Sequence, residues 1–150
     1  MAKDLPRPVV VAVGGSGNGR AAIQLAATEA GYREAPLIAV TAYQAASPLG
    51  APAARPVATM RSPSDDHTTA EAMLGDEVAA VLGEQAEQAE LRTVPGLPGR
   101  KLVETARATN AQMIVLASGL SGSVIAGAVS QYVLRNAPCP VLVVPNRAVT

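Results

Sequence analysis

The sequence predicts one α/β domain, a Rossmann-like doubly wound sheet of five mainly parallel strands with four helices. Three observations carry this prediction. The strand candidates are short and almost continuously apolar, which is typical of strands buried on both faces of a parallel sheet. Helical patterns lie between them, so strand and helix alternate along the chain. The length of 150 residues suits a single domain, and we take residues 1–150 as that domain.

Five segments have the strand pattern, and they cover residues 9–13, 37–43, 91–94, 113–117 and 141–144. The third is the least apolar of the five because it contains Arg92 and Thr93. The chain has no Phe or Trp, so the core must consist mainly of Val, Leu, Ile and Ala. Such small side chains suit helices that pack closely on a sheet.

The first two helices have recognisable start signals. The first is expected over residues 20–30, with Asn18 as N-cap and Gly31 at its end. The second is expected to begin at Thr68, because Thr68 and Glu71 have the spacing of a capping box. The buried faces are predicted to contain Ala22, Ile23, Ala26, Ala27 and Ala30 in the first helix and Leu74, Val78, Val81 and Leu82 in the second.

The third helix can begin at Pro98, and the fourth must end before Pro138. Their buried residues are expected to be Leu102, Val103 and Ala106 in the third and Ile125, Val129 and Val133 in the fourth. Residues 44–67 contain four prolines among Ala and Ser. We expect this segment to be a flexible insertion, either a lid or a disordered excursion.

Composition excludes several classes of function. Twelve basic residues balance twelve acidic ones, which argues against a nucleic-acid partner or an anionic membrane surface. The longest apolar stretches are far below the roughly 18 residues needed to span a bilayer. Cys139 is the only cysteine, so disulfide frameworks and multi-cysteine metal sites are excluded, and a cytoplasmic location is expected. His67 follows Asp65 and Asp66, which we interpret as a solvated charge patch rather than a metal site.

A glycine-rich loop at residues 14–19 follows the first strand and precedes the first helix. Its N–H groups and the helix dipole could hold an anion. The P-loop pattern fails, because Arg20 and Ala21 stand where a lysine and a hydroxyl residue belong. The dinucleotide pattern is met by residues 17–22, but the second strand ends without a carboxylate for a ribose. The alternative is a flexible turn between strand and helix.

A second loop at residues 118–123 has three serines and two glycines before the fourth helix. It also suits phosphate, and its alternative is again a turn, with Ser121 or Ser123 as a cap. Neither loop completes the G-x-S-x-G pattern of a hydrolase. The only histidine, His67, lies in the proline-rich segment, so we assign no catalytic residue.

Four segments resemble the universal stress protein family. They are residues 9–16, residues 96–98 with Leu102 and Ala106, residues 113–116 and residues 127–145. The most specific is G-x-V-S-x-x-V-L-R-x-A-P-C-P-V-L-V-V at residues 127–144. The resemblance runs nearly end to end. It implies the five-stranded fold, a homodimer paired through the last strand and, for many members, ATP binding.

This sequence departs from the family's ATP motif at two points. Gly14 stands where an Asp is expected to hold the nucleoside. The G-x-x-G at Gly119 and Gly122 is followed by four residues instead of nine, and Ala128 replaces a hydroxyl residue. The candidate nucleotide-binding residues implied by the resemblance and by the convergence of strand ends are Val13, Gly15, Ser16, Ala42, Gly119, Gly122, Gly127, Val129 and Ser130.

The resemblance therefore implies a dimeric binding or regulatory module of the stress response, with binding of ATP or AMP weak or absent. The alternative is an ATP-binding member with slow ATP hydrolysis. No general base or carboxylate pair is evident beside either loop, so binding is favoured over catalysis and no metal site is predicted. The expected dimer interface is the last strand, whose edge position would leave backbone groups unpaired; it consists of Val141, Leu142, Val143 and Val144.

Overall fold

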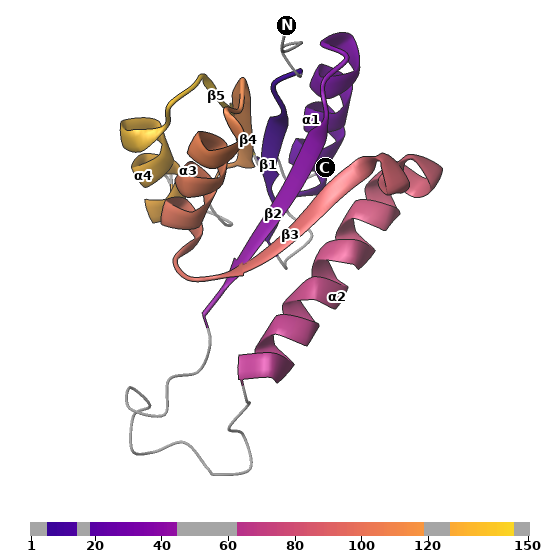
Figure 1. The fold of residues 1–150 in the computed structure, drawn as a ribbon, viewed down its shortest axis with the longest axis vertical. Coiled ribbons are helices and arrows are strands. Elements are labelled where there is room, and N and C mark those ends of the chain that lie inside the picture. The colour runs from indigo at the N-terminus through magenta and orange to yellow at the C-terminus, as the bar shows by residue number, and fades with distance from the viewer. Residues whose placement is uncertain (1–5, 15–18, 45–62, 119–126, 146–150) are drawn as a thin grey trace, which may run out of the picture.

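The computed structural model describes residues 6–14, 19–44, 63–118 and 127–145. In this part of the chain five parallel strands form one sheet in the order β3-β2-β1-β4-β5 (Figure 1). The strands are β1 (Val9–Ala12), β2 (Leu37–Tyr43), β3 (Ala89–Pro95), β4 (Met113–Ala117) and β5 (Val141–Val144). The helices are α1 (Arg20–Tyr32), α2 (Pro63–Leu82), the 3₁₀ helix η2 (Gly83–Gln88), α3 (Pro98–Thr109) and α4 (Ala128–Asn136). The predicted α/β fold class is confirmed.

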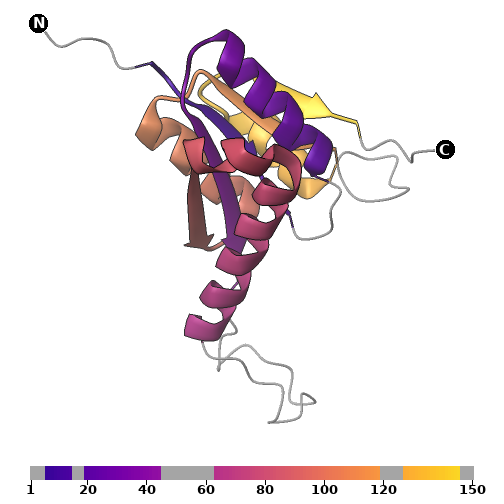
Figure 2. The same ribbon diagram turned by 90° about the vertical axis from the view of Figure 1, so that its right-hand side faces the viewer.

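Two helices cover each face of the sheet, as the two views in Figures 1 and 2 show. Alternate residues of β1 point to opposite faces, because side chains alternate along a strand. Val9 and Val11 pack with α1 and α2, whereas Val10 packs with α3 and α4. All three are fully buried. The continuous apolar run of β1 therefore supplies both halves of the core.

The small face of α1 is confirmed: Ala22, Ile23, Ala26 and Ala30 are buried against the sheet. The predicted ends of this helix are partly wrong. It continues through Gly31 to Tyr32, since a glycine costs a helix only about 1 kcal/mol. Its N-cap position is Gly19, and the predicted cap Asn18 lies outside the described residues.

The predicted start of the second helix is wrong. α2 begins at Pro63, so Thr68 and Glu71 lie inside the helix. Proline is well suited to a first helical turn, and the Glu71 side chain contacts His67 instead of closing a capping box. Residues 63–67 of the predicted insertion are therefore helical, and residues 45–62 lie outside the described residues. The expected buried stripe is confirmed at Leu74 and Val78.

Three other elements, β1, β3 and α4, follow the prediction with small changes, and α3 follows it without change. β1 ends at Ala12, one residue early. β3 is longer than predicted, because it pairs with β2 from the Leu37–Ala89 match to the Tyr43–Pro95 match. The fourth helix buries Val133 as expected, Val129 is half-buried, and Ile125 lies outside the described residues. α3 begins at Pro98 and buries all three predicted residues.

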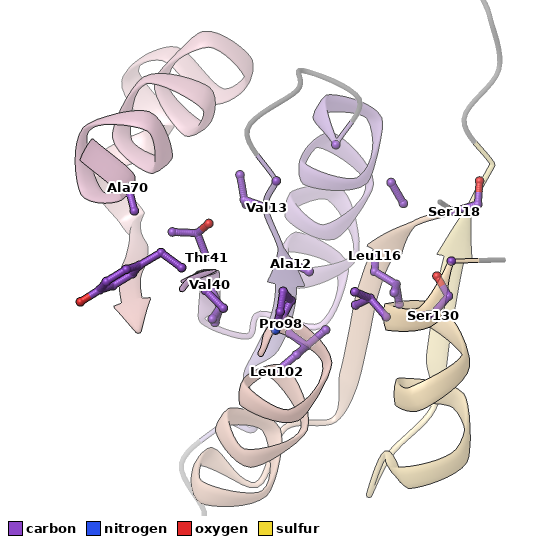
Figure 3. A pocket seen from close by; sticks show the side chains of 18 of the residues that line it. Ala12, Val13, Val40, Thr41, Ala70, Pro98, Leu102, Leu116, Ser118 and Ser130 are labelled. Atoms are coloured by element: carbon purple, nitrogen blue, oxygen red, sulfur yellow. The ribbon is translucent and has the colours of Figure 1, made fainter. Parts of the chain in front are cut away.

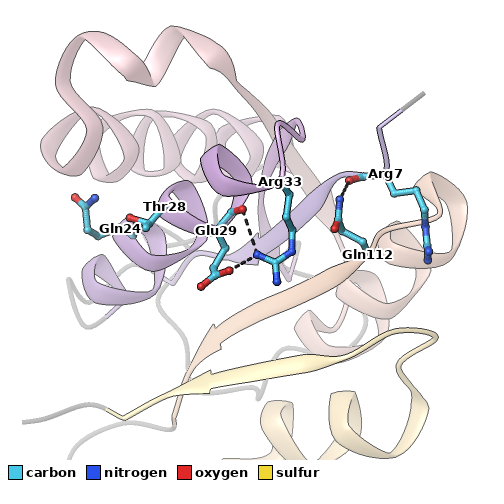
Figure 4. A network of polar contacts seen from close by, with 6 residues as sticks. All are labelled: Arg7, Gln24, Thr28, Glu29, Arg33 and Gln112. Atoms are coloured by element: carbon cyan, nitrogen blue, oxygen red, sulfur yellow. Dashed lines mark hydrogen bonds and ion pairs between the residues drawn. The ribbon is translucent and has the colours of Figure 1, made fainter. Parts of the chain in front are cut away.

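Polar contacts tie the chain together at the amino ends of the strands (Figure 4). The side chain of Gln112, just before β4, donates a hydrogen bond to the Arg7 carbonyl, just before β1. Arg33, which follows α1, forms an ion pair with Glu29. The cavity described below lies at the opposite end of the sheet, at the carboxyl ends of the strands. None of the described helices combines the length and the apolarity needed to cross a bilayer.

Candidate functional site

A cavity of about 750 Å³ lies at the carboxyl ends of β1, β2 and β4 (Figure 3). β1 stands between β2 and β4 in the sheet, so the crossovers from this point run to opposite faces. Such a switch point is where open α/β sheets bind their ligands. The described lining residues are Ala12, Val13, Gly14, Gly19, Val40, Thr41, Ala42, Tyr43, Ala70, Met73, Pro98, Leu102, Leu116, Ala117, Ser118, Gly127, Ala128, Val129 and Ser130.

The structure brings together the candidate residues that it describes. Those lining the cavity are Val13, Ala42, Gly127, Val129 and Ser130. The other four candidates, Gly15, Ser16, Gly119 and Gly122, lie outside the described residues. Residues far apart in sequence thus meet at one cavity, because parallel strands end at the same edge of the sheet.

Gly14 leaves open space at the end of β1. A Cβ atom added there would meet no atom within 4 Å. The neighbouring Val13 is buried, and its N–H donates to the Val40 carbonyl at 2.9 Å. The backbone at the end of β1 is therefore fixed by β2, while the space that a side chain of residue 14 would occupy is accessible.

Three described helices begin at the cavity: α3 starts with Pro98, which has no N–H, whereas α1 and α4 each follow a glycine. Gly19 is the N-cap residue of α1 and Gly127 that of α4, and neither has a side-chain capping hydrogen bond. The first N–H groups of a helix lack intrahelical partners and carry a partial positive charge. Both helix starts can therefore favour an anionic group in the cavity.

The described lining carries no charged side chain. Its polar side chains are those of Thr41, Tyr43, Ser118 and Ser130, and Thr41 and Ser130 are buried. Most of the remaining surface is aliphatic. This arrangement suits a ligand that is largely planar or apolar, and it offers no side-chain cation for a polyphosphate.

The universal stress protein family model matches residues 6–145. The chain belongs to the universal stress protein family. A family member from Thermus aquaticus, named universal stress protein in QAH/OAS sulfhydrylase 3' region, is 32% identical over 142 residues, which cover 92% of this chain and 98% of that protein. The family resemblance seen in the sequence is thereby confirmed.

Solved family structures are also similar to this chain. A universal stress protein crystallised in complex with cAMP is 26% identical, with a TM-score of 0.66, over 96% of this chain and 100% of that one. A universal stress protein from Lactobacillus plantarum is 23% identical, with a TM-score of 0.71, over 95% and 99%. The similarity to the Lactobacillus plantarum protein supports the fold alone. Both structures match nearly the whole chain.

Sequence reasoning missed the contribution of α2 to the site of this family member. Ala70 and Met73 line the cavity from α2, and Tyr43 lines it from the end of β2. The end of β2 was a usable signal for Tyr43, since the carboxyl end of that strand was already predicted to reach the site. Ala70 and Met73 carried no comparable signal, because small and apolar helical residues are ordinarily core.

His67 was predicted to belong to a solvated charge patch before a helix; the structure places it inside α2, with its side chain 42% exposed. Its Nδ1 lies 3.2 Å from the Tyr43 hydroxyl, and its Nε2 lies 3.2 Å from Glu71 Oε2. The Tyr43 and His67 rings meet edge to face, with centroids 5.5 Å apart and planes at 71°. No group of three His, Cys, Asp or Glu side chains suited to a metal ion occurs among the described residues.

Arg20 occupies the position that a P-loop gives to its lysine, directly after Gly19. Its guanidinium contacts both carboxylate oxygens of Glu77 on α2, each at 3.3 Å. The hydrogen bond and the charge of Glu77 raise the pKa of Arg20 above its usual value. This basic side chain is thus paired with α2, and it does not line the cavity.

Proposed function

We propose that this universal stress protein is a homodimeric binding or regulatory module of the stress response whose cavity binds an adenine nucleoside or mononucleotide weakly. The observation that carries the proposal is the cavity at the switch point of the sheet, with open space at Gly14. A family member that is 26% identical over the whole domain has been crystallised with cAMP, which supports the choice of ligand class.

The size and lining of the cavity favour a small ligand. A volume of about 750 Å³ lies within the usual range of ligand pockets, roughly 300–1,000 Å³. The aliphatic lining suits a base and a sugar, and the starts of α1 and α4 suit a single phosphate. Without a lining cation among the described residues, AMP or cAMP is favoured over ATP. The lone cysteine supports a cytoplasmic location as part of this proposal.

Slow ATP hydrolysis is the alternative function, and binding is preferred to it. Hydrolysis of ATP needs a group that positions or activates water and groups that hold Mg²⁺ on the phosphates. The described cavity lining offers neither a carboxylate nor an imidazole. No observation on the described residues therefore favours turnover over binding.

Calorimetric titration of the purified protein with adenosine, AMP, cAMP and ATP, each with and without Mg²⁺, tests the proposal. We expect AMP or cAMP to bind more tightly than ATP, with little effect of Mg²⁺. Absence of binding by all four compounds would overturn the proposal. Tight binding of Mg·ATP with release of phosphate would establish the alternative.

A further inference from the structure

Tyr43 is the last residue of β2 and lines the cavity. It is the only aromatic residue among the described residues that line the cavity. Its carbonyl accepts a hydrogen bond from the Gly96 N–H at 2.8 Å, and the strand pairs it with Pro95 of β3. The backbone that carries the ring is therefore held by the sheet.

The ring itself is held by α2. The Glu71 carboxylate can only accept a hydrogen bond, so its contact with His67 places a proton on Nε2 of the imidazole. In neutral imidazole Nδ1 is then the acceptor, and the Tyr43 hydroxyl donates to it. The edge-to-face contact between the two rings adds a second restraint on the orientation of Tyr43.

This chain of contacts decides which part of Tyr43 a ligand can use. The hydroxyl lies 3.2 Å from His67 Nδ1, and Tyr43 is one of the residues that line the cavity. At the end of β1, Gly14 offers no side chain for a polar contact. Among the described lining residues, Tyr43 at the end of β2 is the one that can offer an aromatic contact to a ligand.

We propose that Tyr43 is the base-recognising residue of this protein, and that its ring packs against the planar base of a purine nucleoside. His67 and Glu71 act as positioning residues that fix the ring in place before the ligand enters. The proposal rests on the proposed function, and it adds which residue recognises the base and how. The opposed interpretation is that Tyr43 and His67 only fasten α2 to the sheet.

Titration with adenosine separates the two interpretations, because adenosine has a base and no phosphate. Replacing a stacking aromatic residue with alanine typically weakens binding of a base by about fivefold to 150-fold. We expect Tyr43→Ala to lose affinity within that range, and Tyr43→Phe, which keeps the ring, to change it less than about threefold. His67→Ala should weaken binding less than Tyr43→Ala, and His67→Gln should restore part of the loss.

Tyr32 supplies the matched control. Its side chain is 80% exposed at the end of α1, and it does not line the cavity. Tyr32→Ala should leave adenosine affinity unchanged. A thermal unfolding curve for each variant checks the fold, and Tyr43→Leu serves where Tyr43→Ala does not fold.

Tyrosine emission gives a readout that a purely structural role would not change. Adenosine should quench the emission of the unmodified protein, and the quenching should disappear in Tyr43→Phe although calorimetry still detects binding. Unchanged adenosine affinity in Tyr43→Ala or Tyr43→Leu would overturn the role of Tyr43 and leave the proposed function intact. Failure of the unmodified protein to bind any adenine compound would overturn the proposed function itself, and this inference with it.

Discussion

Leu116 of β4 and Val143 of β5 are register partners at the last pair of strands in the sheet order. The Pro140 carbonyl accepts a hydrogen bond from the Ile114 N–H of β4, and the Val144 carbonyl accepts one from the N–H of Ser118, which directly follows β4. Because backbone groups alternate along a strand, the N–H and C=O of Val143 point away from β4. Among the described strands β5 stands at the edge, as predicted, and pairing of this edge with a second copy remains a prediction.

The first prediction is a homodimer that Val143→Lys weakens. Two-fold symmetry makes the paired β5 strands antiparallel, so each Val143 meets the same patch of the other copy. Two introduced lysines would then lie near one another across the axis. Light scattering should report a dimer for the unmodified protein at micromolar concentration and a larger monomer fraction for the variant.

Leu91→Lys is the matched control for this prediction. Leu91 lies on β3, at the opposite edge of the sheet, and is 43% exposed. Leu91→Lys introduces the same charge at a strand edge that lies outside the predicted dimer interface. The variant should therefore leave the oligomeric state unchanged. A monomeric unmodified protein, or equal effects of both variants, would rule out pairing through β5.

A second prediction concerns the missing nucleoside anchor. Gly14→Asp should raise the affinity for adenosine, because a carboxylate at the end of β1 can accept a hydrogen bond from the nucleoside, and the space for it is open. A hydrogen bond to a charged group contributes on the order of 1.5–3 kcal/mol, or about one to two decades of affinity. Adenosine is the suitable probe, since a new negative charge would repel a phosphate.

Gly31→Asp adds the same charge at a site away from the cavity. A Cβ at Gly31 also meets nothing within 4 Å, and Gly31 lies near the end of α1. Calorimetry should show a gain for Gly14→Asp only. If that variant shows no gain, while a second variant with a lengthened loop after Gly122 does, loop length is the limiting difference from the family motif.

A third prediction tests the start of α4 as a phosphate site. Gly127 has φ −54° and ψ 162°, a conformation open to any residue, so Gly127→Val should fold. The added side chain would prevent close approach of a phosphate to the first N–H groups of α4. Calorimetry should show weaker binding of AMP, with adenosine less affected. Equal losses for AMP and adenosine, or none, would contradict a phosphate position at Gly127, and Gly31→Val is the control.

Continuous apolar runs predicted the bounds of three of the five described strands. β2, β4 and β5 have the predicted bounds, because their apolar runs coincide with the stretch that the neighbouring strands cover. β3 was predicted too short, since Glu90 precedes the apolar start at Leu91 and Pro95 follows its apolar end at Val94. Its true length is set by pairing with β2, which is a tertiary effect that no local pattern contains.

The candidate site was predictable to the extent that strand ends and glycines mark it. Val13, Ala42 and Gly127 were found because parallel strands and the following helices converge at one edge. The contact of His67 with Tyr43 could not be found, because it depends on α2 beginning at Pro63 and passing the end of β2. The pattern of charged residues around His67 does not indicate which strand the following helix will pack beside.

The last prediction concerns the reactivity of Cys139, which is half-buried beside the core under α3 and α4. Burial raises the pKa of the Cys139 thiol, and the positive charge of Arg7 opposes part of that rise. A raised pKa means less thiolate at neutral pH, so iodoacetamide should react more slowly with the folded protein than with the protein unfolded in urea. As pH is raised, the iodoacetamide reaction of the folded protein should accelerate at a higher pH than the reaction of the unfolded chain.

The same shift links Cys139 to stability in alkaline solution. As pH rises, the Cys139 thiol ionises at a lower pH in the unfolded chain than in the folded protein. Its contribution to the free energy of unfolding is therefore complete below the unfolded pKa, about 8.5. This contribution is lost as pH rises through the folded pKa. Arg7→Gln should raise the folded pKa further, whereas Cys139→Ala should remove this part of the alkaline loss of stability. Urea unfolding and iodoacetamide rates, measured across this pH range, check both effects. Equal midpoints for the folded and unfolded thiol would show that burial at Cys139 does not control its ionisation.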